Sequence, residues 1–183
     1  MIHLDLTERG VGRLLAGLAL LFSTTTFAQE ALFSYQGFTD DLDVSSIAAH
    51  DRSRIWSTCA VVHDLMALVD NGGTSSSSAQ ESKNQSNGAK LASAIVFLAE
   101  YIEQEKNPTP DEFSARWEMA KMVMDSNFTT IQTSMMADME RNPDGTLERL
   151  VPTYAYCIKI LPTQQLYIDL WREMYGSGLL KPQ

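Results

Sequence analysis

Two cysteines and one histidine are the residues of this chain best suited to chemistry. Cys59 and His63 are four positions apart, so on a helix they lie on one face. A thiolate beside an imidazole is the core of a cysteine nucleophile, and the same spacing suits a metal ion. Cys157 competes with both roles, because a bridge to Cys59 removes the thiolate. We therefore expect His63 to be structural and keep catalysis or a metal site as the alternative.

Methionines form a second candidate site. Six of them fall within 21 residues, from Met119 to Met139. Thioethers are soft ligands suited to Cu(I), but flexible methionines also fill irregular cores and line adaptable binding surfaces. We expect core packing first, a binding surface second and copper third. The candidate copper ligands are Met119, Met122, Met135, Met136 and Met139, with His63 as an additional one.

Other catalytic and cofactor patterns are missing from the sequence. It contains no nucleophile elbow, no glycine-rich phosphate loop and no haem-attachment motif. Charged residues such as Glu112 and Arg116 have the spacing of ordinary pairs on a helix surface. We therefore expect no cofactor and no catalytic residue, and keep an enzyme whose site is assembled from distant residues as an alternative.

The start of the chain has the three parts of a secretory signal peptide. Arg9 and Arg13 precede a nine-residue apolar run, Leu14–Phe22, and small residues follow as far as Ala28. The run is much shorter than the ~20 residues that cross a bilayer. We therefore predict a signal peptide over 1–28, cleaved before Gln29, a periplasmic or secreted protein, and no stable membrane insertion.

Export determines the expected state of the cysteines and the expected partners. In an oxidising compartment an even number of cysteines indicates a bridge, so we predict a disulfide between Cys59 and Cys157. The chain-entropy model gives a loop of this length about 4 to 5 kcal/mol of stabilisation. The net charge of -9 disfavours nucleic acids and anionic lipids as partners.

The composition of residues 29–45 indicates an extended arm that precedes the helices. Three aromatic residues follow one another there at close to alternate spacing, and no second strand is available to pair with them. We expect the arm to lie against the helical body. Its candidate partner-binding residues are Phe33, Tyr35 and Phe38.

Apolar residues in the rest of the chain recur at three- and four-residue steps, which predicts helices. Five to six helices with mostly short links predict an all-α, single-domain antiparallel bundle over 46–183, with a flexible polar loop at 74–78. We expect helices over 46–69, from about 79 to Asn107, from Pro110, and over 126–141. A turn at 142–145 then precedes a helix that buries Leu147, Val151, Tyr154, Ile158 and Leu161, and a last helix ended by Gly176 and Gly178.

Taken together, these patterns favour binding over chemistry. We predict an exported, non-enzymatic interaction protein, such as an inhibitor, an immunity factor, a chaperone or an accessory subunit, with a protein partner in the cell envelope. Copper handling and a hidden enzyme site are the alternatives.

Overall fold

The protein is all-helical over the residues that its computed structural model describes, which are 47–70, 77–104 and 108–180. These ranges contain no strand, which confirms the predicted all-α class. None of their helices is long and apolar enough to cross a bilayer. The helices are α2 (Ala49–Asp70), α3 (Ser77–Gln104), α4 (Pro110–Arg141), α5 (Pro143–Lys159) and α6 (Leu161–Gly176).

Several predictions concern residues outside this described part. They are the signal peptide with its cleavage after Ala28, the arm at 29–45, and residues 74–76 of the predicted loop. The candidate partner-binding residues Phe33, Tyr35 and Phe38 also lie outside it. The last two residues of the predicted loop, 77 and 78, instead open α3.

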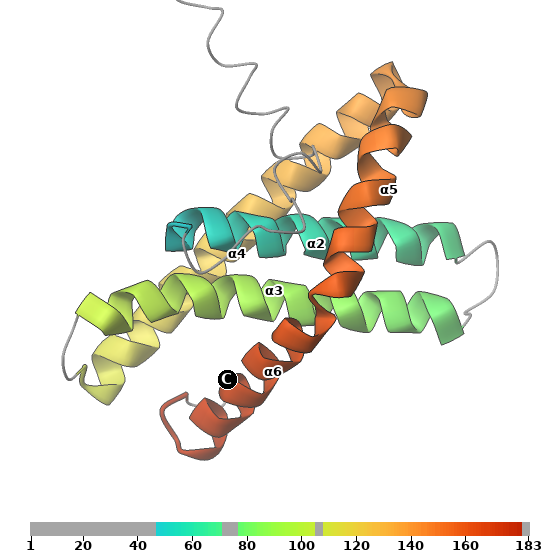
Figure 1. Cartoon of the computed structure of the whole chain (residues 1–183). Coiled ribbons are helices and arrows are strands. Elements are labelled where there is room, and N and C mark those ends of the chain that lie inside the picture. The colour runs from blue at the N-terminus through green and yellow to red at the C-terminus, as the bar shows by residue number, and fades with distance from the viewer. Residues whose placement is uncertain (1–46, 71–76, 105–107, 181–183) are drawn as a thin grey trace, which may run out of the picture.

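The α2 and α3 helices form an antiparallel pair, and the other helices cross it (Figure 1). In this view α4 passes behind the pair and packs on both helices, whereas α5 passes in front and packs on α2. α6 continues from α5 and packs on α3. The pair therefore has helices on two sides, and its residues supply most of the buried core.

Small side chains allow α2 and α3 to approach each other closely. The hydroxyl of Ser93 on α3 lies 2.8 Å from the hydroxyl of Ser53 and 2.9 Å from that of Ser57, both on α2. It also donates to the carbonyl oxygen of Ser53 at 2.8 Å. Ser86 donates in the same way to the carbonyl of Ala60 at 2.8 Å. Because these serines are buried, they satisfy their hydroxyls across the interface instead of with water.

α4 is one helix of 32 residues where the sequence predicted two. Its start agrees with the prediction, because the side chains of Thr109 and Glu112 bond each other's backbone amides in a capping box. The predicted break at Ser126 is wrong. The residues around it are weak helix formers, but none of them is a proline or glycine. Phe128 and Ile131, one turn later, pack against α2 and favour a continuous helix.

The predicted turn at 142–145 is the first turn of α5. The side chain of Asn142 accepts a hydrogen bond from the amide of Gly145 at 3.1 Å, and Pro143 occupies the first turn, where no amide is needed. Asparagine, proline and glycine also favour turns, which explains the wrong prediction. Pro152 lies inside this helix.

α5 and α6 meet at a single residue, Ile160. The amide of Ile160 donates to the carbonyl of Tyr156 at 3.1 Å, and its own carbonyl accepts from the amide of Gln164 at 3.0 Å. Helical hydrogen bonding therefore spans the junction, and Pro162, which has no amide hydrogen, accounts for the interruption. As a result α6 follows α5 directly, and the two run one after the other across the α2–α3 pair (Figure 1).

Candidate functional site

The predicted disulfide is present and joins α2 to α5. Cys59 and Cys157 are bonded, their Cα atoms are 5.4 Å apart, and both side chains are buried. The bond uses both thiols, so Cys59 supplies neither a nucleophile nor a metal ligand while the bridge is intact. It also sets the rotation of α5 about its own axis, because Cys157 must point at α2.

His63 lies one turn after the bridge and is fully buried. Its ring packs edge-to-face on Tyr154, with the ring centroids 5.7 Å apart. Neither ring nitrogen has a hydrogen-bond partner among the described residues. Burial removes water from the imidazole and lowers the pKa of His63 to about 4, so the ring is neutral at pH 7. Within the described ranges no three His, Cys, Asp or Glu side chains gather into a group that could hold a metal ion.

The candidate methionine ligands all lie on α4, in two groups. Met119 and Met122 are separated from Met135 by at least 13 residues, or about 20 Å along the helix axis. Met135 is buried in the core beside Val61 and Val62, whereas Met122 is mostly exposed. One copper ion cannot reach both groups. A copper site would therefore use only one of them, and copper binding stays a prediction.

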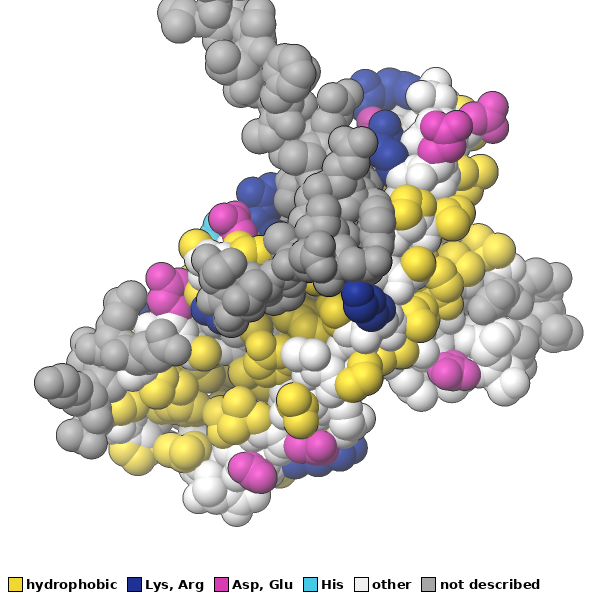
Figure 2. All heavy atoms as spheres, in the orientation of Figure 1, with side chains coloured by type: hydrophobic (Ala, Val, Ile, Leu, Met, Phe, Trp, Pro, Cys, Tyr) yellow, Lys and Arg dark blue, Asp and Glu magenta, His cyan; other side chains and the backbone are white. Residues whose placement is uncertain are grey.

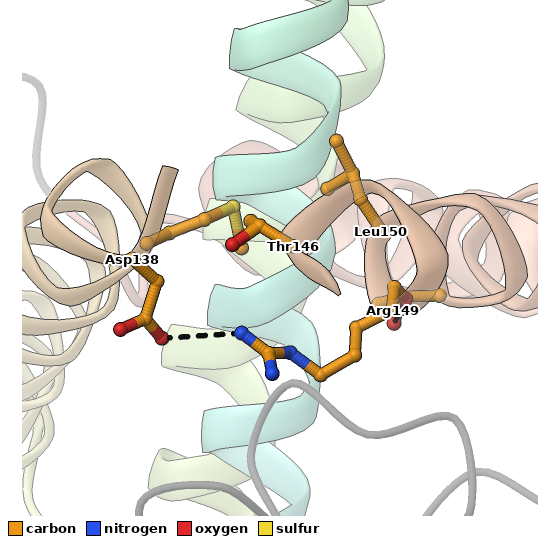
Figure 3. Close-up of a pocket in the computed structure, with 6 residues that line it drawn as sticks. Asp138, Thr146, Arg149 and Leu150 are labelled. Carbon is orange, nitrogen blue, oxygen red and sulfur yellow. Dashed lines mark hydrogen bonds and ion pairs between the residues drawn. The ribbon is translucent and has the colours of Figure 1, made fainter. Parts of the chain in front are cut away.

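A small cavity lies where the end of α4 meets the start of α5 (Figure 3). Its volume of about 10 Å³ is room for about one water molecule. The guanidinium of Arg149 points across it to the carboxylate of Asp138, at 3.5 Å, and Arg141 pairs with the same carboxylate. The cavity is too small for a substrate, and its charged groups serve to join the two helices.

A larger groove of about 370 Å³ lies between α4 and α6, and Leu91 of α3 also lines it. Trp117 and Trp171 line it, and Tyr175 stacks on Trp171 with the ring centroids 5.5 Å apart. The charged lining residues, Glu118 and Lys121, form an ion pair of 2.8 Å. The groove has the size of a small-molecule site, but its lining brings together no nucleophile and base.

The apolar stripe of α5 faces away from the protein, contrary to the prediction. Leu147, Val151 and Ile158 were expected in the core, but all three are exposed, and Val151 is 66% exposed. Tyr154 and Leu161 are half-buried at the edge of the stripe. The buried side chains of α5 are instead Thr146, Thr153, Tyr156 and Cys157.

α6 also carries exposed leucines. Leu166 is 69% exposed and Leu170 is 43% exposed, so both project from the solvent side of that helix. Between the two groups, Ala155 and Pro162 are also exposed. We call the surface made by Leu147, Val151, Ile158, Leu166 and Leu170 the α5–α6 apolar face. It is about 35 Å long at the helical rise, and Figure 2 shows hydrophobic side chains along both helices.

Acidic residues flank this face at both ends. Asp144 and Glu148 lie one helical turn from Leu147 and Val151, and Glu173 lies near Leu170. These three carboxylates are exposed and form no ion pair with any described residue. A fourth acid, Asp169, pairs with Arg172 at 2.9 Å. The charge along the face is therefore mainly negative.

Sequence reasoning missed this face because it assigned the most apolar side of α5 to the core. The predicted bridge between Cys59 and Cys157 would have corrected this assignment of the buried side of α5. Cys157 must point at α2, and residues three, four and seven positions before it share its side of the helix. Those residues include Leu150 and Thr153, whereas Val151 and Ile158 lie about 100° or more away.

No protein-family model matches this chain, and no curated protein and no solved structure matches it. The candidate sites are therefore interpreted from geometry and chemistry alone.

Proposed function

We propose that the protein is an exported, non-enzymatic interaction protein that binds another protein through the α5–α6 apolar face. One observation carries the proposal. α5 separates apolar from polar residues more strongly than any other described helix, yet its apolar stripe points outward. An exposed apolar surface of this kind is characteristic of binding sites.

The size of the face limits the affinity that apolar contact alone can give. Full burial of one aliphatic side chain contributes about 1.5 to 3 kcal/mol, and these residues are roughly half exposed on average. Covering all of them would therefore contribute on the order of 5 kcal/mol. Association itself costs about 4 to 15 kcal/mol. Apolar contact along this face thus gives weak binding unless further contacts add to it.

Compartment and domain organisation are part of the same proposal. The buried bridge is compatible with an oxidising compartment, as the predicted signal peptide requires. We propose that residues 46–183 form one helical bundle domain, since the three buried clusters of α2 to α6 are linked through Phe128 and Tyr167. We also propose that the arm at 29–45 contributes Phe33, Tyr35 and Phe38 to partner binding.

A comparison of captured proteins tests the proposal. The oxidised protein and a variant carrying Val151→Ser and Leu166→Ser would be immobilised and exposed to the same envelope extract. The matched control is Met122→Ser, because Met122 is 65% exposed but lies on α4. We expect one or more specific proteins to be retained by the wild type and the control and lost from the double variant.

Two results would count against the proposal. One is the capture of no protein by the wild type. The other is the same set of proteins on all three baits, because the captured proteins would then bind elsewhere. Thermal unfolding of each bait should be measured alongside, since exposed substitutions are expected to change stability by no more than about 0.5 kcal/mol.

A further inference from the structure

The α5–α6 apolar face has the geometry of a helix-pairing surface. Along α5, the sequence places Leu147, Val151, Tyr154, Ile158 and Leu161 at alternating steps of four and three residues. This is the spacing with which one helix packs along another. On α6, which follows α5 directly after Ile160, the exposed leucines of the face, Leu166 and Leu170, are four residues apart. An amphipathic helix is therefore the occupant that fits it best.

The charged residues beside the face determine whether a basic or an acidic helix binds better. The acids beside the face, Asp144, Glu148, Asp169 and Glu173, outnumber the bases, Lys159 and Arg172. Arg172 bonds Asp169. Lysines or arginines beside the apolar stripe of an incoming helix would meet unpaired carboxylates. Glutamates or aspartates in the same positions would meet like charge.

The same charges disfavour a second copy of this chain as the occupant. If two copies paired in antiparallel fashion about the middle of the face, Glu148 of each copy would lie opposite Asp169 of the other. In a parallel arrangement Glu148 would lie opposite itself. Acid would face acid in both cases, and each chain carries a net charge of -9.

We infer that the α5–α6 apolar face binds a basic amphipathic helix of a partner protein, with the apolar stripe of that helix on Val151 and Leu166 and its lysines or arginines beside Glu148 and Glu173. This inference rests on the proposed function and adds the chemistry of the partner. The apolar residues contribute part of the binding free energy. The charged residues select a basic helix and add the affinity that apolar contact alone does not provide.

Two designed peptides test the inference. One carries leucines at four- and three-residue spacing with lysines beside them, and the other has glutamate in place of every lysine. Each is labelled and titrated with the oxidised full chain. We expect the leucine–lysine peptide to bind at least about tenfold more tightly than the leucine–glutamate peptide. Its advantage should fall as salt is raised and the charges are screened.

Variants of the protein separate binding at this face from general attraction to an acidic protein. Val151→Ser with Leu166→Ser should weaken binding of the leucine–lysine peptide at least about tenfold. Met122→Ser should leave it unchanged. Glu148→Gln with Glu173→Gln should reduce the preference for lysine over glutamate while leaving the leucine–glutamate peptide at least as tightly bound as before.

Several outcomes would overturn the inference. If both peptides bind equally and both need Val151 and Leu166, the face binds a helix without selecting a basic one, and only the proposed function stands. If neither peptide binds, and envelope capture does not depend on these residues, the proposed function fails as well. A dimer in sedimentation that the double serine variant dissociates would assign the face to a second copy. Binding to vesicles of phosphatidylcholine and phosphatidylglycerol that the same variant abolishes would assign it to a membrane.

Discussion

At the scale of single residues, His63 combines complete burial with two unbonded ring nitrogens. A buried polar group without a partner costs stability, and a charged one costs more. The ring therefore stays neutral in the folded state, and burial is the cause of its lowered pKa. Burial therefore makes His63 a source of acid sensitivity in the fold.

The pH dependence of stability follows from that pKa. The unfolded chain takes up a proton on His63 near pH 6.5, whereas the folded chain does so only at about pH 4. Between these values the unfolded state binds more protons, so stability falls as the pH falls through this window. At pH 4.5 the loss relative to pH 7.5 should be about 2 to 3 kcal/mol from this residue. Urea unfolding at the two pH values measures it.

The control for this prediction is His63→Phe, which keeps an aromatic ring of similar size and removes the titration. Carboxylates contribute to acid sensitivity in both proteins, so the difference between the two pH profiles isolates His63. Parallel profiles for wild type and variant would show that the imidazole is not desolvated in the folded protein.

At this scale the sequence predicted the disulfide better than the hydrogen bonds between side chains that are distant in the chain. The bridge between Cys59 and Cys157 followed from the cysteine count and is present. The assignment of His63 as a structural residue agrees with its burial. The buried cluster around Ser93 was not predicted, because serine is usually exposed and its burial here depends on hydroxyl partners that lie about 40 residues away.

At the scale of helices, local signals predicted where elements begin better than which side they bury. The predicted start of a helix at Pro110 is confirmed, because the capping box that fixes it needs only the neighbouring residues Thr109 and Glu112. The inward face of α5 depends on the tertiary constraint at Cys157, and the prediction from periodicity alone is wrong. An apolar stripe shows that a helix has one apolar face, but it does not show whether the protein core or a partner covers that face.

The contact of α6 with α3 provides a prediction at this scale. A side chain at Gly88 on α3 would meet the amide nitrogen of Gln164 at 2.2 Å and the end of Ile168 at 3.1 Å, both on α6. Gly88→Leu should therefore displace α6 and cost about 1 to 3 kcal/mol of unfolding free energy. Gly176→Leu is the matched control, because nothing lies within 4 Å of an added side chain there. Equal stabilities would contradict this packing.

At the scale of the whole molecule, the bridge connects α2 to α5 across a sequence separation of 98 residues. α3, α4 and the loops between them lie inside the closed loop. Its largest effect is expected on the unfolded chain, whose freedom the bridge restricts.

Removing the bridge should destabilise the protein strongly. Cys59→Ala with Cys157→Ala is expected to lower the free energy of unfolding by about 4 to 5 kcal/mol in the chain-entropy model. Chemical denaturation of the two proteins measures the difference, and a thiol assay on the native wild type should detect no free sulfhydryl. A loss below about 1 kcal/mol, or two reactive thiols before unfolding, would contradict this role.

The outward orientation of the α5 stripe is tested most directly by thiol labelling at two neighbouring positions. Val151→Cys and Thr153→Cys each add one thiol to the bridged protein, on opposite sides of α5. A maleimide should label the thiol at 151 within about tenfold of its rate in the unfolded chain, and the thiol at 153 at least about a hundredfold more slowly. Slow labelling at 151 and fast labelling at 153 would mean that the stripe is buried and that no docking face exists there.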